Sequence, residues 1–294
     1  MKMYAMASCS HEFIAEEIFE KSILAHEPKI NYSIEKIEQL CGSGNYYEAG
    51  WKEAMDLKIG LYNQAINEND DFFIWSDVDI EFHQPFMEDL LNTINSSDFD
   101  ILFQKGYGPF GEPEYCAGFF ICRINKNTKD FFKYIYNNRE QYPCDQEAIN
   151  QNIDKIKAGF LSEKYFNISK QYRNWNNQNI ELPDNIIMCH ANYTIGTENK
   201  IKMLLKIKNQ IKNNKTNINV NTTKEKIQVI NAVYGLFEDI TEMVSSIEQK
   251  TLFDAEKIGV NIIPTHKKSL YIFDQNYQLL NKPMADKTWL IPND

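Results

Sequence analysis

The stretch FFIWSDVDIEF, residues 72–82, is the part of the sequence that most strongly indicates the fold. Four apolar residues run from Phe72 to Trp75, and Ser76 separates them from Asp77-Val78-Asp79. A short, continuously apolar run is typical of a strand with both faces buried, as in the parallel sheets of α/β proteins. We therefore expect a core strand that delivers two carboxylates to a ligand crevice at its carboxyl end.

The two aspartates need compensation for their charge. Because side chains alternate along a strand, Asp77 and Asp79 point the same way if the strand persists, with Val78 turned inward between them. Two carboxylates crowded in a partly dry place require a shared proton or a cation, and a hard divalent ion with oxygen ligands meets that need. Three interpretations stay open at this point: a metal clamp, a nucleophile with its acid, and the polar start of a loop.

The nucleophile interpretation corresponds to a phosphatase of the haloacid dehalogenase type. In that class the motif usually continues with Thr or Val two residues on, whereas position 81 here is Glu. The motif also usually lies close to the N-terminus, and here at least two expected strand–helix units precede it. Both features count against a phosphatase.

Strands and helices are expected to alternate on both sides of this stretch. Over about 190 residues, such alternation indicates an α/β sheet domain. Apolar patterning predicts strands at 2–8, 98–104, 115–125 and 185–189, and helices at 11–26, 46–69, 86–94, 127–140 and from 145 onward.

The composition changes near residue 200. Residues 200–225 hold seven lysines and one acid, so the local charge is 7 − 1 = +6. We predict three parts: an α/β domain at 1–205, a basic, Asn-rich linker at 206–225, and a small β-rich module of unknown role at 226–294. The basic stretch at 200–225 is interpreted as a solvated face, with weak contact to anionic membrane lipid as the alternative.

Overall composition excludes several classes of function. The net charge of −10 argues against nucleic acid as a partner. Six cysteines without a CxxC pair predict reduced thiols in a reducing compartment. The sequence has no signal-peptide core and no run of 18 apolar residues, so we expect a cytoplasmic protein without a transmembrane segment.

Three further motifs carry polar groups suited to a ligand site. Ala117-Gly118 lies where a small residue lets a ligand approach the backbone. Asp145-Gln146 heads an expected helix and suits sugar hydroxyls, although an N-cap role would also explain Asp145. His190 follows another apolar strand and supplies an imidazole that Mn²⁺ accepts beside carboxylates.

The order of four motifs resembles that in the nucleotide-diphospho-sugar transferase family grouped as glycosyltransferase family 77, and in the related family 8. The motifs are WSDVDIEF, YCAGFFICR, DQEAIN and HANYTIGTENK. The resemblance covers residues 3–205. It implies a GT-A fold, that is, a Rossmann-like mixed sheet flanked by helices. It also implies a metal-dependent glycosyltransferase that moves a sugar from a UDP-sugar to a hydroxyl of a glycan, lipid-linked sugar or protein, with retention of anomeric configuration and with Mn²⁺ or Mg²⁺ as cofactor.

The resemblance also implies roles for particular residues. Asp145 would lie near the reacting sugar and Gln146 would stabilise it, which makes them the catalytic candidates. Asp79 would be the direct metal ligand, Asp77 would bridge metal and ribose, and His190 would complete the metal shell. The donor-binding candidates are Ala7, Ser8, Lys58, Asp77, Asp79, Ala117, Gly118, Gly196 and Lys200.

Some of these assignments have alternatives. Lys58 matches a lysine of the family on the helix before the DxD strand, and it is interpreted equally as a donor contact or as a surface lysine. The spacing His190-x5-Gly196-x3-Lys200 is looser than in family 8 and lacks the Pro-Trp that follows there.

A function of another class also stays open. The protein could be a non-catalytic sugar- or nucleotide-binding module, in which the β-rich tail would bind the ligand.

Overall fold

The structure is a computed structural model that describes residues 1–42, 48–172 and 174–216, with side chains as far as residue 213. Beyond these residues it describes the backbone of five short strands. Contacts divide the chain into two compact units, Met1–Ile207 and Lys208–Asp294.

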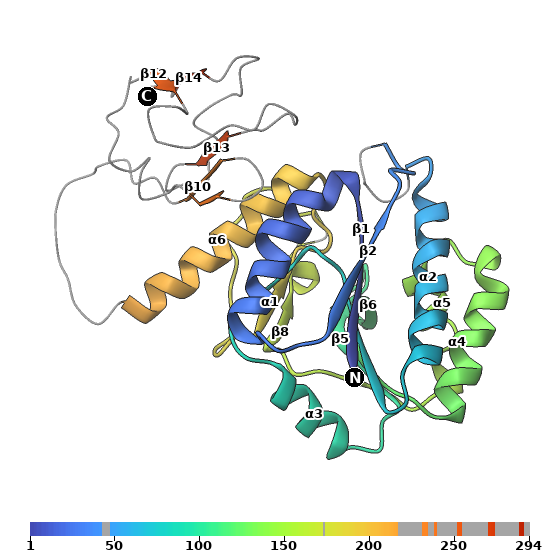
Figure 1. Cartoon of the computed structure of the whole chain (residues 1–294). Helices are drawn as coiled ribbons and strands as arrows, with labels where there is room; N and C mark the ends of the chain where they lie inside the picture. Colours follow the sequence, from blue (N-terminus) through green and yellow to red (C-terminus); the bar gives the residue numbers. More distant parts are fainter. Residues whose placement is uncertain are drawn as a thin grey trace. The chain divides into compact units, whose positions relative to one another are not determined.

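A six-stranded mixed sheet forms the centre of the first unit (Figure 1). Its order is β2-β1-β3-β6-β5-β7. β1 pairs in parallel with β2 and β3, β6 runs antiparallel to β3 and β5, and β7 is parallel to β5. The strands are β1 (Lys2–Ser8), β2 (Tyr32–Ile37), β3 (Phe72–Ser76), β5 (Ile101–Tyr107), β6 (Pro113–Arg123) and β7 (Ala158–Phe160).

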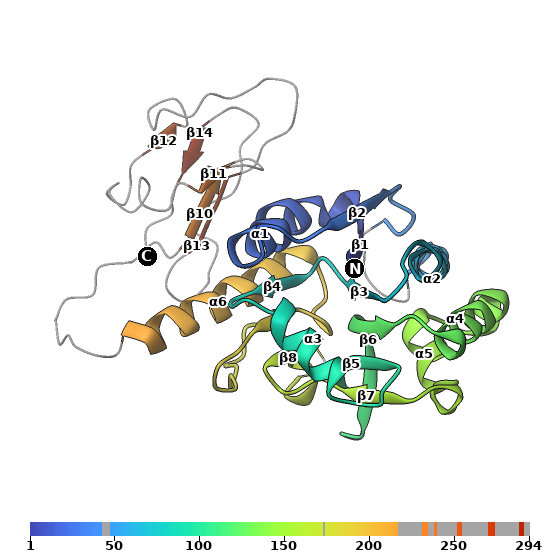
Figure 2. The same cartoon turned by 60° about the horizontal axis from the view of Figure 1, so that its bottom comes forward.

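Helices cover both faces of this sheet (Figures 1 and 2). One face carries a π-helical turn (Ile14–Glu20), α1 (Lys21–His26) and α3 (Met87–Asn95). The other face carries α2 (Trp51–Glu68), α4 (Lys126–Asn138) and α5 (Asp145–Asn150). Short 3₁₀ turns lie at Cys9–His11, Arg139–Gln141, Ile153–Lys155 and Ile168–Lys170.

The two faces of β3 pack into two separate cores. Ile74 belongs to the core shared with α1 and α3, whereas Phe73 and Trp75 belong to the core shared with α2 and α4. All three are completely buried, so the prediction of a strand with two buried faces is confirmed. In the second core the ring of Tyr62 meets Trp75 edge-on, with ring centroids 4.5 Å apart, a favourable aromatic geometry.

The strand does not continue through the aspartates. β3 ends at Ser76, where the Asp77 N–H donates to the Gly118 carbonyl at 2.7 Å. After Asp79 the chain joins a second sheet, of order β4-β9-β8, made of β4 (Ile80–Phe82), β9 (Met188–His190) and β8 (Tyr165–Asn167). The DxD pair therefore lies at the break between two sheets.

Helix α6 (Thr197–Thr216) runs into the stretch predicted as a linker. The helix occupies residues 206–216 of that stretch, and the three-part division of the chain stays a prediction. Ile207 and Ile211 follow Leu204 at spacings of three and four, which extends the apolar face of the helix. The remainder of the predicted linker, 217–225, lies outside the described residues.

All elements described beyond α6 are short strands. They are β10 (Asn231–Tyr234), β11 (Glu238–Asp239), β12 (Leu252–Asp254), β13 (Leu270–Phe273) and β14 (Thr288–Leu290). β10 pairs antiparallel with β11 and β13, and β12 pairs antiparallel with β14. The segments between these strands lie outside the described residues, and the β-rich module at 226–294 stays a prediction.

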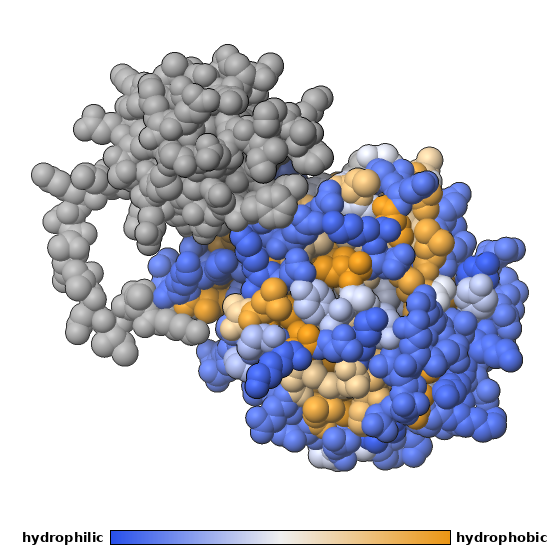
Figure 3. Space-filling model, in the orientation of Figure 1, coloured by the Kyte–Doolittle hydropathy of each residue, from blue (hydrophilic) through white to orange (hydrophobic). Residues whose placement is uncertain are grey.

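None of the six cysteines, all of them in the described part, forms a disulfide. Within the described residues no helix is both long and apolar enough to cross a membrane. On the face shown in Figure 3, hydrophilic residues cover most of the described surface and hydrophobic residues gather in several separate areas.

Candidate active site

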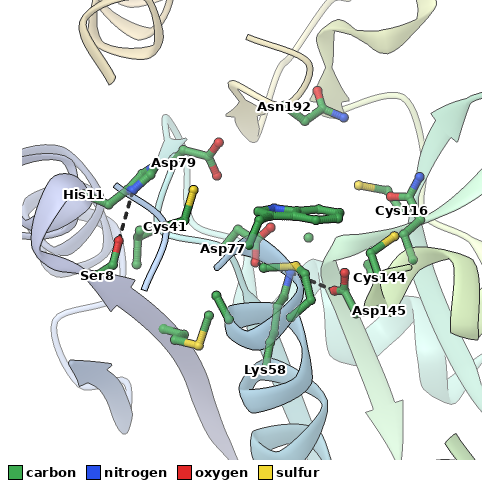
Figure 4. A pocket seen from close by; sticks show the side chains of 18 of the residues that line it. Ser8, His11, Cys41, Lys58, Asp77, Asp79, Cys116, Cys144, Asp145 and Asn192 are labelled. Carbon is green, nitrogen blue, oxygen red and sulfur yellow. Dashed lines mark hydrogen bonds and ion pairs between the residues drawn. The ribbon is translucent and has the colours of Figure 1, made fainter. Parts of the chain in front are cut away.

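The DxD pair opens into a cavity of about 560 Å³, a size typical of small-molecule sites (Figure 4). Its wall comes from the ends of β1 and β2, from α2 and α5, from β6, and from the segment that follows β9. Ten predicted site residues line it: Ser8, Lys58, Asp77, Asp79, Ala117, Gly118, Asp145, Gln146, His190 and Lys200.

Two predicted donor residues do not line this cavity. Ala7 is buried within β1, beside a smaller cavity between β1, β2 and the π-helical turn. Gly196 has a φ of 86°, the left-handed region that glycine adopts most easily, and its carbonyl accepts the Lys200 N–H at 3.1 Å. Gly196 therefore shapes the start of α6, which carries Lys200 to the cavity.

The fold brings together three side chains that could bind a metal ion. One donor atom each from Asp77, Asp79 and His190 lies within 4.8 Å of the others. His190 Nε2 is 3.2 Å from Asp79 Oδ1 and 4.0 Å from Asp77 Oδ2. Two carboxylate oxygens and one imidazole nitrogen suit a borderline divalent ion such as Mn²⁺. The residues present therefore fit the predicted cation.

Gly118 makes this close approach possible. A Cβ at Gly118 would stand 2.2 Å from His190 Cε1 and 2.9 Å from Asp77 Oδ2, far inside contact distance. From the sequence, we expected Gly118 to make room for a ligand to approach the backbone. In the structure, the first groups that need the space are the protein's own side chains.

Lys58 is not a surface lysine. It is only 5% exposed, and its Nζ lies 2.7 Å from Asp77 Oδ1 and 2.9 Å from Asp145 Oδ2. Burial alone would lower the pKa of Lys58, but the two carboxylates outweigh it and raise the pKa. Lys58 shares the inner face of α2 with Ile59 and Tyr62, and this explains its burial.

The two aspartates have different electrostatic surroundings. Burial would raise the pKa of Asp79, but Lys200, whose Nζ is 2.9 Å from Oδ2, and His190 hold it well below its usual value. For Asp77, burial outweighs the attraction of Lys58, and its pKa is raised. Asp79 is therefore the more firmly ionised carboxylate of the pair.

The ring of His190 is held from behind by Gln104, a residue that the sequence did not indicate. Gln104 is completely buried, and its Nε2 donates to the carbonyls of Phe166 at 2.9 Å and Tyr165 at 3.2 Å. Its Oε1 therefore faces His190 Nδ1, 2.8 Å away, and accepts the Nδ1–H. This arrangement leaves Nε2 turned toward Asp79.

Asp145 is positioned by α2. The Tyr62 hydroxyl donates to Asp145 Oδ2 at 2.7 Å, and the same oxygen pairs with Lys58. The N-cap explanation of Asp145 was wrong, because Cys144 is the N-cap of α5 and its Sγ accepts the Glu147 N–H at 3.5 Å. Asp145 is instead the first helical residue, and it points into the cavity (Figure 4).

The chain after β1 contributes a second residue that the sequence analysis missed. His11 Nε2 lies 3.3 Å from Lys200 Nζ, and its Nδ1 lies 3.0 Å from Ser10 Oγ. Burial first, and then the charge of Lys200, lower the pKa of His11 to about 4. A neutral His11 can accept a hydrogen bond from the Lys200 ammonium. A histidine just beyond the first strand was the only sequence signal for it.

The cavity at the ends of the mixed sheet brings together the carboxylates of Asp77, Asp79 and Asp145, the imidazoles of His11 and His190, and the lysines Lys58 and Lys200. Such a gathering of charged side chains in one cavity of an α/β fold is typical of an enzyme site for a polar, charged ligand. The sequence profile of one family, described as nucleotide-diphospho-sugar transferase, matches residues 16–204. The chain belongs to this family of transferases, as predicted. The prediction of a mixed α/β sheet flanked by helices is likewise confirmed.

Individual relatives are more distant. An uncharacterized protein of Arabidopsis thaliana, At4g15970, is 33% identical over 104 residues, which cover 31% of this chain and only about a quarter (25%) of that relative. A glycosyltransferase involved in glycosylation of the major capsid of PBCV-1 is 14% identical, with 65% and 93% coverage and a TM-score of 0.43. The galactosyltransferase LgtC, solved with donor and acceptor sugar analogs, is 12% identical, with 65% and 87% coverage and a TM-score of 0.38.

Proposed function

We propose that the protein is a glycosyltransferase that moves a sugar from a UDP-sugar to a hydroxyl of a glycan, lipid-linked sugar or protein, with retention and with Mn²⁺ or Mg²⁺. We assign this activity to the first compact unit, residues 1–207. The observation that carries the proposal is the meeting of Asp77, Asp79 and His190 in one cavity with Lys58 and Lys200. Family membership supports a nucleotide-sugar donor.

We place the donor in the cavity by the charges of the residues that line it. We assign the nucleoside to the part of the cavity lined by Ser8, residues 37–41 and Trp51. The diphosphate then faces Lys200, which lies in the first turn of α6, where the positive end of the helix dipole favours an anion. Asp77, 30% exposed, is assigned to the ribose side and the buried Asp79 to the metal side.

The cluster of Asp77, Asp79 and His190 lies beside the position that we assign to the leaving group. A divalent cation bound there would neutralise the negative charge that develops on the departing diphosphate. Asp79 and His190 would hold the cation, and Gln104 fixes the ring that presents Nε2 to it. Lys58 limits the repulsion between Asp77 and Asp145 through its two short ion pairs.

The sugar is assigned to the end of the cavity near Asp145. Among the described residues, both partners of this carboxylate bind Oδ2, so we assign Oδ1 to a sugar hydroxyl. A carboxylate held by Lys58 and Tyr62 is better suited to orienting a substrate than to attacking carbon. Gln146 donates to Glu114 Oε2 at 3.2 Å and belongs to the same wall.

Retention then follows from attack on the face that the phosphate leaves. The bond between the anomeric carbon and the phosphate oxygen breaks, and the bond to the acceptor oxygen forms on the same side. The proton of the acceptor hydroxyl passes to the departing phosphate oxygen. No covalent sugar–enzyme intermediate is needed in this scheme.

We place the acceptor beside the hairpin between β5 and β6. Pro109 in this hairpin lines the cavity, and the neighbouring Phe110 is 96% exposed. An aromatic ring at the mouth of a cavity offers a flat apolar surface to the ring of a sugar. Phe110 is therefore our candidate for acceptor contact.

The test is a panel of nucleotide sugars incubated with the full chain and Mn²⁺, with UDP release as the readout. We expect slow UDP release from at least one UDP-sugar, and none after removal of divalent ions with EDTA. Metal-independent release, or none from any UDP-sugar, would sink the proposal. The phosphatase alternative makes the opposite prediction: Mg²⁺-dependent cleavage of a phosphomonoester and phosphorylation of Asp77.

A further inference from the structure

We propose a second metal site, selective for a thiolate-binding ion such as Zn²⁺, formed by Glu81, His83 and Cys189. One donor atom each of these three residues lies within 4.8 Å of the others. Nothing in the proposed transfer reaction uses them. The proposed metal site is independent of that reaction, and a separate experiment tests it.

Strand pairing explains why the three side chains converge. Glu81 and Cys189 are direct partners in the antiparallel pair of β4 and β9, so their side chains share one face. His83 follows Glu81 by two positions, and its N–H donates to the Ile187 carbonyl at 2.7 Å, which extends the ladder beyond β4. The period of two thus places His83 on the same face.

The opposite face of the same strand pair serves the DxD site. Ile80 is paired with His190, whose ring reaches Asp79, and Phe82 is paired with Met188 in the core. Cys189 and His190 are neighbours along β9, so their side chains point to opposite faces of the strand pair. His190 lies on the face of the DxD site and Cys189 on the other face. The two ligand sets cannot merge into one site, because the backbone of the pair lies between them.

The distance between the nitrogen and sulfur ligands suits a small tetrahedral ion. His83 Nε2 lies 3.2 Å from Cys189 Sγ. Around a tetrahedral Zn²⁺ with bonds of about 2.0 Å to nitrogen and 2.3 Å to sulfur, these two atoms would lie about 3.5 Å apart. The nitrogen–sulfur pair needs only a few tenths of an ångström of movement, and a carboxylate supplies the third protein ligand.

The donor chemistry separates this site from the DxD cluster. A thiolate and an imidazole favour Zn²⁺ and similar ions, whereas the two carboxylates of the DxD cluster favour Mn²⁺ or Mg²⁺. Glu81 and Cys189 are buried, at 3% and 0% exposure, and His83 is half-buried, so an ion would enter past His83. Binding releases the Cys189 thiol proton to solvent, and the two anionic ligands balance the charge of the ion.

The test uses Co²⁺ as a spectroscopic substitute for Zn²⁺ on the metal-stripped full-length protein. A sulfur-to-cobalt charge-transfer band reports a thiolate ligand directly. We expect this band at one Co²⁺ per chain, its loss on addition of Zn²⁺, and its absence in Cys189→Ser. The half-exposed His83→Ala should weaken binding roughly 100-fold or more, since even an outer-shell partner is worth 10- to 100-fold.

Three control variants make the result specific. Cys122→Ser removes a buried thiol of the main sheet, Asp79→Ala disables the DxD cluster, and Cys116→Ser removes the thiol 3.9 Å from His190. All three should keep the band. No thiolate band in the wild type, a band that survives in Cys189→Ser, or a band lost in Cys116→Ser would overturn the proposal. If Cys189→Ser does not fold, an unchanged affinity in folded His83→Ala would overturn it equally.

Discussion

His190 and Gln104 show how much a single side-chain contact can determine in this site. An imidazole offers either of two nitrogens to a cation, and the choice depends on the partner of the other nitrogen. Here the amide of Gln104 has its own orientation fixed by two backbone carbonyls. It accepts the Nδ1–H of His190 and so directs Nε2 toward the aspartates.

We predict that Gln104→Leu weakens Mn²⁺ binding by about 10- to 100-fold, because the ring loses the acceptor that fixes its orientation. Gln104→Glu keeps an acceptor for the Nδ1–H but loses the Nε2 donor that orients the side chain, so its Mn²⁺ affinity should lie between those of wild type and Gln104→Leu. Calorimetric titration of Mn²⁺ into the folded variants measures the difference. Equal Mn²⁺ affinity in wild type and Gln104→Leu would show that the amide does not position the ligand.

His11 gives the stability of the protein a pH dependence. Its pKa falls from 6.5 in the unfolded chain to about 4 in the fold, so between these values the unfolded chain binds more protons. The stability that neutral His11 contributes is therefore complete above pH 6.5 and is lost as the pH falls toward 4. In His11→Gln, the fall in the free energy of unfolding over this range should shrink on the order of 2 kcal/mol.

Urea denaturation of both proteins at several pH values across this range measures the effect. Carboxylates that titrate in the same window change both proteins alike, so the difference between the two curves isolates His11. Parallel curves would contradict the assignment.

At the scale of elements, α2 connects the aromatic core to the site. Its inner face carries Tyr62, whose ring packs against Trp75, and one turn earlier Lys58, which joins Asp77 to Asp145. The same helix thus fixes the carboxylates by charge and by a hydrogen bond. Rigid packing of the ring holds the hydroxyl in place.

Removing the lysine should therefore cost stability. Lys58→Met leaves the buried Asp145 and the partly exposed Asp77 without their shared cation and should lower the free energy of unfolding by about 3 kcal/mol. Lys126→Met, which breaks an exposed i,i+4 pair with Asp130, should leave it nearly unchanged, because water screens this pair. Urea denaturation near pH 7 measures both, and similar small values would mean that Lys58 does not neutralise the pair.

The hairpin between β5 and β6 carries the acceptor prediction. Phe110→Ala should raise the KM for whichever hydroxyl acceptor stimulates UDP release, because the exposed ring beside the cavity-lining Pro109 is lost. Hydrolysis of the donor without acceptor should stay unchanged. Steady-state kinetics with and without acceptor separate the two effects, and an unchanged acceptor KM would remove Phe110 from the site.

The longer elements were predictable from the sequence, whereas the strands β2, β7 and β8 were not predicted. The apolar run at 72–75 and the helical spacing in the predicted helix 46–69 lead to β3 and to α2, which begins five residues later than predicted, at Trp51. The break at Asp77 was not predictable, since it depends on a hydrogen bond to Gly118, more than 40 residues later. The same holds for Gln104, which follows an irregularity in the β5–β6 register.

At the scale of the whole molecule, the order of motifs predicted the family but not the electrostatic pairing inside the site. The sequence places Lys58 on a helix without showing that it turns inward between Asp77 and Asp145. It places Lys200 after His190 without showing its contacts with Asp79 and His11. Such pairings depend on how distant elements pack, and a single sequence does not contain that information.

The central claim is that the DxD cluster holds the cation that binds the donor. The most direct measurement is the affinity of UDP for the full chain with and without Mn²⁺, in wild type and in Asp79→Ala, by calorimetry. Asp98→Ala, at an exposed residue paired with Lys157, is the matched control. We predict strong UDP binding only with Mn²⁺, its loss in Asp79→Ala and its retention in Asp98→Ala. UDP binding that is equally strong without Mn²⁺, or unchanged in Asp79→Ala, would contradict the claim.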